Sequence, residues 1–395
     1  MTLKFNPYCE EFYQNPWQNF RALRTQDPVH YIEEFDAWAL FGFEDVWRAG
    51  MDRESFTATY GSSPQALLID RVKQPEIFLF MDIPNHMIHR GIIAKDYGRN
   101  AMPLLEGKIR ATAKEAITPY LKSGEMDVYA FARTVALFTI ADMIGLRPEE
   151  VVRIRSLIDI FFGRTPGHRG TTPDGVAAFH EVTAYVLDLI GHYRAKGAPE
   201  GSHIDNWLKA EPDGRPLDDQ ALCANIFSLS ITGSDTVPLS SAAAIYYLSE
   251  HPAQLEAVRS DRALIPAAFA ETVRYDQPTN VLGRLLAIDT DKYGKPMKKG
   301  QAVLFMYASA NRDPLEFEHP DTFNIYRDPR RTLSFGSGIH ICLGQLLAKL
   351  EGQIILETLF EHIPDFTVQY KEVRRIPGEF LQGFGVMPIR FPLRT

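Results

Sequence analysis

The pattern of apolar and polar residues along the chain is mainly that of amphipathic helices. Apolar residues spaced three or four positions apart predict one helix over residues 343–362. Residues 221–249 are mostly apolar and predict a long helix at the centre of the fold, and residues 267–275 predict a shorter helix. These segments favour a mainly α-helical protein.

Strand patterns are fewer and shorter. Apolar runs bounded by turn residues predict strands at residues 38–41, 285–288 and 302–306. The polar segment between the last two, residues 289–300, contains glycine and proline and indicates a hairpin connection. Residues 163–174 are rich in helix breakers and indicate a loop between helices. The predicted fold class is therefore mainly α with a small β-rich region.

Length, charge and cysteine content narrow the picture. The chain has 395 residues without an internal repeat or a low-complexity linker, so we expect a single domain over residues 1–395. The net charge is −8 without a basic tract, and a nucleic-acid partner is not expected because phosphate contacts need clustered Lys and Arg. No apolar run approaches the roughly 20 residues that span a bilayer, and the N-terminus has no signal-peptide pattern. Three cysteines cannot form a disulfide framework, so we expect a cytoplasmic protein without a membrane span.

The strongest chemical signal is a glycine-rich segment around one cysteine, at residues 333–352. Cys342 directly precedes the predicted helix, where the helix dipole favours a thiolate. Gly338 and Gly344 would let the backbone approach a flat, bulky group. No second cysteine lies nearby to complete a zinc or iron–sulfur site, whereas one thiolate is what a thiolate-bound haem needs. A buried cysteine packed in a helix-start turn is the alternative.

This segment resembles the haem-ligand loop of the cytochrome P-450 family, and the residues that carry the resemblance are Phe335, Gly338, Cys342 and Gly344. Further likeness covers residues 36–49, 310–327 and 383–391, so it spans nearly the whole chain. The resemblance implies the cytochrome P-450 fold, haem b (iron protoporphyrin IX) as cofactor and Cys342 as the iron ligand.

Four further residues match family positions that bind the haem propionates: His86, Arg90, Arg284 and His340. His86 and Arg90 are four residues apart and share one face of a helix that begins near Pro84. Several cationic donors around two carboxylates are electrostatically favourable. A solvated charged face is the alternative for His86 and Arg90.

Glu271 and Arg274 are three residues apart on another predicted helix and can pair. Taken alone, such a pair is usually a solvated surface pair. The resemblance implies instead that the pair is buried and joined by Arg327 in a structural lock that takes no part in catalysis.

The long predicted helix contains a segment similar to the oxygen-activation motif of the family. The resemblance assigns catalytic roles to Asp235 and Thr236, because an adjacent carboxylate and hydroxyl can deliver protons. Gly233 would leave room for dioxygen. Thr232 departs from the alanine or glycine often found there, and Pro238 lacks an N–H, so the helix should open or kink. A simple helix kink is the alternative.

The resemblance implies a monooxygenase that inserts one oxygen atom from O₂ into a small hydrophobic substrate. Residues assigned to the substrate pocket are largely apolar, with core packing as the alternative for each: Leu229, Gly233, Thr279, Val281, Leu282 and Phe384. Terpenoids, steroids, aromatic acids and fatty acids all remain open as substrates.

Electrons would come from a separate partner, since the chain has no room for a reductase domain. The resemblance implies that this partner is a ferredoxin with its ferredoxin reductase. The basic docking patch would comprise Arg99, Lys108, Arg330, Arg331 and Lys349. Two alternatives stay open, a peroxygenase of the same fold and a haem-binding sensor without turnover. The Asp235–Thr236 pair argues against both, because hydrogen peroxide brings its own protons and a sensor does not need an acid–alcohol pair.

Overall fold

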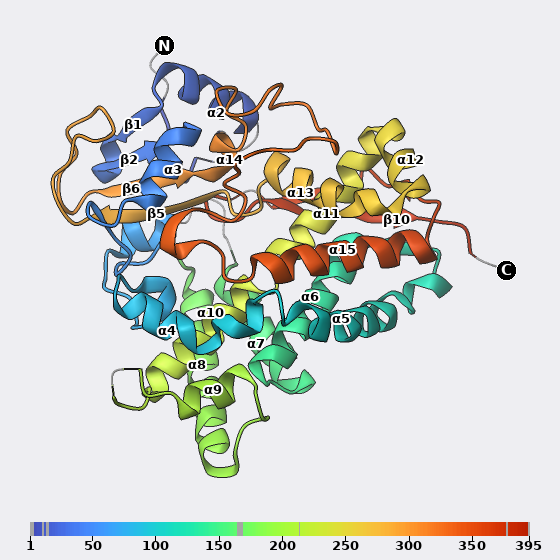
Figure 1. Cartoon of the computed structure of the whole chain (residues 1–395), viewed down its shortest axis with the longest axis horizontal. Helices are drawn as coiled ribbons and strands as arrows, with labels where there is room; N and C mark the ends of the chain where they lie inside the picture. The colour runs from blue at the N-terminus through green and yellow to red at the C-terminus, as the bar shows by residue number, and fades with distance from the viewer. Residues whose placement is uncertain are drawn as a thin grey trace.

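The computed structural model describes residues 4–9, 12, 16–163, 169–212, 214–376 and 378–393. In Figure 1 the larger β-sheet lies at the left, beside the N-terminal helices, and most of the helices fill the centre and right. The prediction of a mainly α-helical fold with a small β-rich region is confirmed.

The described α-helices are, in chain order, α2 (Pro16–Gln26), α3 (Phe43–Met51), α4 (Asn85–Ala94), α5 (Met102–Ile117), α6 (Val128–Ile144), α7 (Pro148–Phe161), α8 (Pro173–Lys196), α9 (His203–Lys209), α10 (Asp219–Thr232), α11 (Thr236–Glu250), α12 (Pro252–Ser260), α13 (Ile265–Tyr275), α14 (Tyr307–Ala310) and α15 (Gln345–His362). The described strands are β1 (Val29–Ile32), β2 (Ala37–Leu40), β3 (Phe56–Thr57), β4 (Glu125–Asp127), β5 (Val281–Leu286), β6 (Ala302–Met306), β7 (Thr367–Val368), β8 (Arg374–Ile376), β9 (Gly383–Val386) and β10 (Pro388–Arg390). The predicted loop at 163–174 separates α7 from α8, and its residues 164–168 lie outside the described part.

The main sheet has the strand order β1-β2-β6-β5-β3, in which β2 and β6 run parallel and the other neighbours antiparallel. The hairpin predicted between β5 and β6 is confirmed by their pairing and by a bridge between Thr290 and Met297. β5 begins at Val281, four residues before the predicted start at 285. The prediction missed the first part of the strand because Gly283 and Arg284 interrupt its apolar pattern. Gly283 is required there, since a Cβ would lie 2.5 Å from the carbonyl oxygen of Val303.

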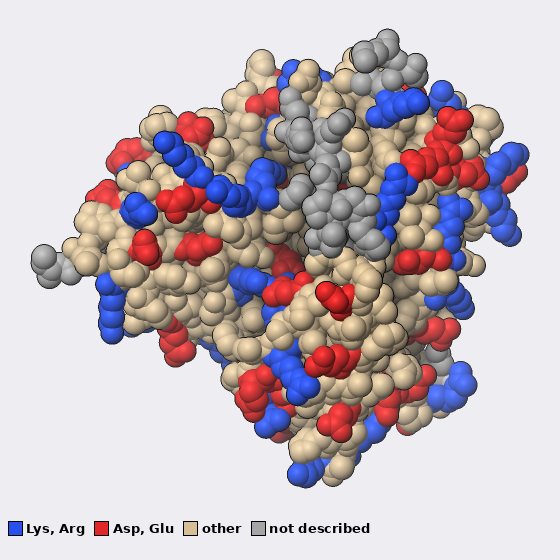
Figure 2. All heavy atoms as spheres, turned by 180° about the vertical axis from the view of Figure 1, so that it is seen from behind, with Lys and Arg blue, Asp and Glu red and all other residues tan. Residues whose placement is uncertain are grey.

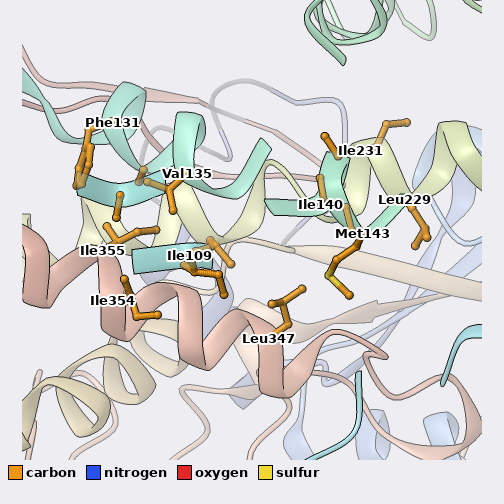
Figure 3. Close-up of a cluster of buried hydrophobic side chains, with 14 of the residues drawn as sticks. Ile109, Phe131, Val135, Ile140, Met143, Leu229, Ile231, Leu347, Ile354 and Ile355 are labelled. Atoms are coloured by element: carbon orange, nitrogen blue, oxygen red, sulfur yellow. The ribbon is translucent and has the colours of Figure 1, made fainter. Parts of the chain in front are cut away.

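α15 runs through the larger hydrophobic core. Figure 3 shows its residues Leu347, Ile354 and Ile355 beside side chains of α5, α6 and α10. The segment Gly338–His362 is long and apolar enough to cross a membrane by composition, and α6 with α7 would pass the same test if they were not bent by 117°. Packing of α15 against α5, α11 and α13 accounts for its apolar character as that of a core helix.

The helix predicted over residues 221–249 is two helices, α10 and α11, with a break at residues 233–235. Pro238 has no N–H to donate to the carbonyl of Ser234, and the predicted opening beside it is confirmed. Within the break, the hydroxyl of Ser234 donates to the carbonyl of Ser230 (2.6 Å). The polar residues Ser234 and Asp235 at the break are buried inside the molecule.

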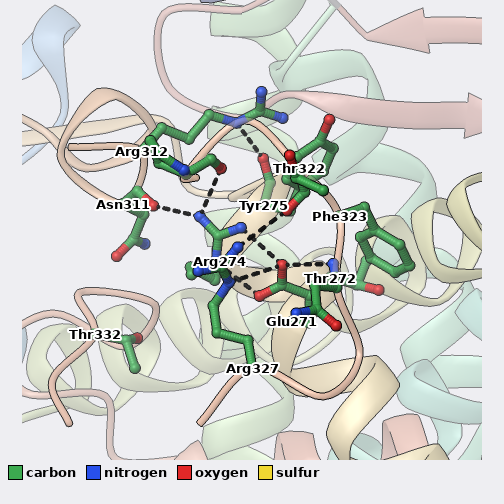
Figure 4. A network of polar contacts seen from close by, with 12 residues as sticks. Glu271, Thr272, Arg274, Tyr275, Asn311, Arg312, Thr322, Phe323, Arg327 and Thr332 are labelled. Atoms are coloured by element: carbon green, nitrogen blue, oxygen red, sulfur yellow. Dashed lines mark hydrogen bonds and ion pairs between the residues drawn. The ribbon is translucent and has the colours of Figure 1, made fainter. Parts of the chain in front are cut away.

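A buried ionic network joins α13 to the segment that leads to Cys342 (Figure 4). Arg274 donates to both carboxyl oxygens of Glu271, at 2.7 and 2.8 Å, and to the carbonyl of Asn311 at 2.8 Å. Arg327 donates to Glu271 at 3.2 Å and to three carbonyls of residues 318–322. The structure thus brings together the three residues predicted to form a structural lock.

Replacing Arg274 by Met should lower the free energy of unfolding by about 3–5 kcal/mol, because it leaves the carboxylate of Glu271 buried without its main partner. The side chains of Arg274 and Glu271 are 1% and 2% exposed. Arg390→Met is the matched control, since that arginine is 59% exposed and its pairing should contribute about 0–1 kcal/mol. Urea unfolding measures both variants, and equal losses would contradict the assigned burial.

Candidate active site

A cavity of about 1090 Å³ lies where the α10–α11 break, the start of α15, β5 and the segment around Cys342 meet. Pockets for small molecules have volumes of roughly 300–1,000 Å³. The cavity therefore has room for a large cofactor and a substrate together. Its wall includes Cys342, Arg90, Arg284, His340 and Thr236.

The thiol of Cys342 faces this cavity from a turn that precedes α15. The N–H of Cys342 donates to the carbonyl of Phe335 (2.9 Å), which closes the turn. Burial among protein atoms raises the pKa of the Cys342 thiol, against the opposing effects of the Gly344 N–H and the charge of Arg90. The Gly344 N–H and Arg90 therefore do not offset the effect of burial on the thiol, whereas a metal ion ligated by the sulfur would stabilise the thiolate.

The glycines of this turn have different roles. Gly344 lines the cavity with open space beside it, since a Cβ would come no closer than 4.0 Å, to the Tyr97 ring. Gly338 does not line the cavity, and its φ is +73°. A Cβ on Gly338 would lie 1.9 Å from the carbonyl oxygen of Gly50 at the end of α3. The expected approach to a flat group is thus corrected for Gly338, which allows the loop to pack on α3.

Cationic and imidazole side chains gather at one end of the cavity. The rings of His86 and His340 are 4.4 Å apart, and neither ring nitrogen of His86 has a hydrogen-bond partner among the described residues. Arg90 donates to the carbonyl of Ile341 (2.8 Å) and Arg284 to that of Gly283 (2.7 Å), and no carboxylate of the described residues pairs with either. Burial followed by these two charges lowers the pKa of His86 to about 4. Unmatched positive charge of this kind fits a ligand that carries carboxylates.

Asp235 and Thr236 both line the cavity at the helix break. The Asp235 Oδ2 accepts a hydrogen bond from Arg155 of α7 (3.0 Å), and Arg155 also donates to Ser234 (2.8 Å). Burial raises the pKa of Asp235 in spite of Arg155. Gly233 lies at the cavity wall, but a Cβ there would be 2.5 Å from a side-chain carbon of Ile140. Close packing on α6 therefore requires glycine at 233, in addition to any need for space.

The assigned substrate residues divide into two groups. Leu229, Thr279 and Leu282 line the cavity, as Gly233 does. Val281 and Phe384 are absent from its lining, which corrects their assignment. Successive side chains of a strand face opposite sides, so Leu282 faces the cavity and Val281 packs in the core beneath the sheet. Phe384 on β9 stacks on Tyr246, with 4.3 Å between ring centroids.

Comparison with known proteins identifies the family. The family model described as cytochrome P-450 matches residues 199–393. A cytochrome P-450 of Mycobacterium tuberculosis, numbered 123, is 31% identical and covers 99% of this chain and 98% of its own length. The chain belongs to the cytochrome P-450 family. Pulcherriminic acid synthase of Bacillus subtilis is 29% identical over 92% of both chains. The crystal structure of CYP109E1 from Bacillus megaterium with testosterone has a TM-score of 0.86 at 26% identity, covering 97% of this chain and 99% of its own.

As a member of this family, the P-450 is a haem-thiolate monooxygenase with haem b as its cofactor. The described residues fit that cofactor: a thiol faces the cavity, and two guanidinium groups without carboxylate partners lie at one end of it. His86 and His340 add nitrogen atoms at the same end, although His86 lies behind the lining. These residues would hold the two propionates.

The sequence pattern also held signals that pointed to further residues of this P-450. Arg155 lies four residues after Val151 and three before Ile158, both of which are buried, so it interrupts an apolar stripe. Glu351 likewise follows Leu347 by four residues, lines the cavity and is 2% exposed, and its Oε1 has no hydrogen-bond partner in the described part of the chain. Burial raises the pKa of Glu351 well above its usual range. A charged residue within an apolar stripe was the available signal in both cases.

Acidification should destabilise the haem-free protein through His86. The pKa of His86 is lowered from 6.5 to about 4 on folding, so between these values the unfolded chain binds a proton that the folded chain does not. The free energy of unfolding should therefore fall as the pH decreases from about 7 to about 5. Urea unfolding at several pH values should show a shallower fall for His86→Asn, and parallel curves for the two proteins would contradict the assignment.

Proposed function

We propose that this P-450 inserts one oxygen atom from O₂ into a small hydrophobic organic molecule, with electrons from a separate ferredoxin and ferredoxin reductase. The observation that carries the proposal is the convergence of the Cys342 thiol and the Asp235–Thr236 pair on one large cavity. We further propose one haem domain over residues 1–395 in the cytoplasm. A cytochrome P-450 relative that aligns with 99% of the chain supports the single domain.

The chain's own residues would bind and orient the cofactor. Cys342 would ligate the iron through Sγ, and the cations Arg90 and Arg284 would hold the propionates with His86 and His340. When bound, haem supplies the activation of dioxygen. The Glu271–Arg274–Arg327 network would keep the segment before Cys342 rigid and would take no part in catalysis.

Proton delivery would take place at the break between α10 and α11. Thr236 would hold a proton on its hydroxyl at the cavity wall, and the neighbouring Asp235 carboxyl would resupply it. The raised pKa of Asp235, caused mainly by burial, lets this carboxyl take up a proton more readily. Arg155 donates to Oδ2 of Asp235, so the other oxygen, Oδ1, would carry the proton.

The Thr236→Ala variant tests the proposed monooxygenase against a peroxygenase. The amount of product formed per electron pair should fall, by up to roughly 10²-fold, which is the loss expected when an acid–base group is removed. The remaining electrons should appear as hydrogen peroxide. Turnover driven by added peroxide should survive. Thr232→Ala is the matched control, because that hydroxyl donates to the carbonyl of Ser228 (3.0 Å). Unchanged coupling in Thr236→Ala would overturn the role of Thr236.

We propose a ferredoxin docking patch with fewer cations than the five predicted from the sequence. Lys108 pairs with Asp142 (2.7 Å), and Arg331 pairs with Glu316 (2.6 Å). Arg99, Arg330 and Lys349 are exposed without an ion pair among the described residues, and Lys349 lies 5.5 Å from the centre of the Phe335 ring, beside the Cys342 turn. Figure 2, which views the molecule from behind Figure 1, shows Lys and Arg interspersed with Asp and Glu. Arg99, Arg330 and Lys349 are therefore the favoured docking residues.

Charge reversal in the Arg330→Glu, Lys349→Glu double variant should slow reduction by ferredoxin about tenfold at low salt, because it removes the attraction that steers encounter. The difference should shrink as salt screens the charges. Stopped-flow reduction measures this effect, with the exposed Lys122→Glu as control. Rates and salt dependence equal to those of the control would exclude this docking surface.

A further inference from the structure

Resting on the proposed function, in which Cys342 ligates iron, we infer that Gln277 is a positioning residue whose side-chain amide holds the start of the Cys342 turn. The Cys342 turn comprises residues 333–342, and Gln277 follows the last residue of α13, Tyr275, by two positions. Gln277 is 3% exposed and lines the cavity, as Ser334 and Phe335 of the turn do.

The Glu271–Arg274–Arg327 network stops short of the Cys342 turn. Among the described residues, its hydrogen bonds to other parts of the chain go to backbone groups of residues 311–324. The start of the turn, residues 333–335, is therefore held by contacts of its own.

Two buried amides form a chain from the end of α13 to the start of the turn. Gln277 Nε2 donates to the carbonyl of Ser334 (3.2 Å), and Gln277 Oε1 accepts from Asn311 Nδ2 (3.0 Å). Asn311 is fully buried, and its Oδ1 accepts from the N–H of Leu333 (2.9 Å). The side chain of Gln277 thus binds one residue of the turn directly and the residue before it through Asn311.

The backbone groups at the two ends of this chain fix the orientation of both amides. A carbonyl can only accept, so the amide nitrogen of Gln277 faces Ser334. A backbone N–H can only donate, so the amide oxygen of Asn311 faces Leu333. The remaining contact then joins a donor of Asn311 to an acceptor of Gln277, and a residue at 277 without both groups breaks the chain.

The backbone at Gln277 is itself held in place. Gln382, which is 3% exposed, donates from Nε2 to the carbonyl of Gln277 (3.1 Å). The N–H of Gln382 donates to the carbonyl of Pro278 (2.9 Å). The amide of Gln277 therefore extends from a fixed point, so it can hold the turn in position.

The start of the turn determines where the sulfur of Cys342 lies. Phe335 directly follows Ser334, and its carbonyl accepts the N–H of Cys342 (2.9 Å). Without the Gln277 amide, the carbonyl of Ser334 would lose its donor and the turn would shift toward a new partner. A displaced sulfur would give less electron density to iron, which would raise the reduction potential and favour loss of thiolate ligation.

The Gln277→Leu variant of the haem-loaded protein tests this role, because leucine is of similar size and can neither donate nor accept. The fraction of the reduced, carbon monoxide-bound sample without the thiolate band should rise about threefold or more. The ratio of ferrous to ferric haem at a fixed potential should rise by a similar factor, as measured by a spectroelectrochemical titration.

Gln254→Leu is the matched control. Gln254 of α12 donates to the carbonyl of Phe323 (2.9 Å) and accepts from the N–H of Ile325 (2.8 Å), so it makes the same two kinds of hydrogen bond outside the Cys342 turn. This control should lower the melting temperature and leave the thiolate band and the ferrous-to-ferric ratio unchanged. The same pattern in Gln277→Leu would mean a merely structural role and would overturn the inference.

If Gln277→Leu binds no haem, Gln277→Asn replaces it. The shorter amide cannot reach Ser334 and Asn311 together, so both readouts should move in the same direction by a smaller factor. Values equal to those of the unmodified protein would overturn the inference.

The unmodified protein separates failure of this inference from failure of the proposed function. A thiolate band in the unmodified protein that Gln277→Leu leaves unchanged contradicts the role of Gln277 alone. Absence of the band from the unmodified, haem-loaded protein contradicts the proposed function itself.

Discussion

The bond that Cys342, which faces the cavity, would make through its sulfur to a haem iron is the interaction on which the other features of the site depend. Burial raises the pKa of Cys342, and neither the Gly344 N–H nor Arg90 reverses that effect. The iron of haem would supply the missing charge, and the propionates of the same cofactor would match the guanidinium groups of Arg90 and Arg284, which have no carboxylate partner among the described residues. Protein and cofactor would thus neutralise each other at this site.

The support around Cys342 is a set of close, buried contacts. The Glu271–Arg274–Arg327 network fixes the preceding segment (Figure 4). Asn311 accepts from the Leu333 N–H (2.9 Å), which ties that segment to the start of the cysteine turn. The near contact of Gly338 with Gly50 fixes the turn against α3. Rigid support of this kind lets the substrate end of the cavity vary without disturbing the ligand sulfur.

The sequence predicted what depends on local spacing. Periodicity located α13 and α15, and the motif around Cys342 located the cofactor end of the cavity. The start of β5 was misplaced because Gly283 and Arg284 break its apolar pattern. Distant contacts that the resemblance did not imply could not be predicted from the sequence: Arg155 meets Asp235 across 80 positions, and Phe161, Phe179 and Phe227 meet only after α7, α8 and α10 pack together.

Carbon monoxide binding to the reduced, haem-loaded protein tests the central claim, the bond between Cys342 and iron. The unmodified protein should give the long-wavelength absorption band of thiolate ligation, and Cys342→His should give the band of imidazole ligation. An imidazole band from the unmodified protein, or a thiolate band that persists in Cys342→His, would contradict the account.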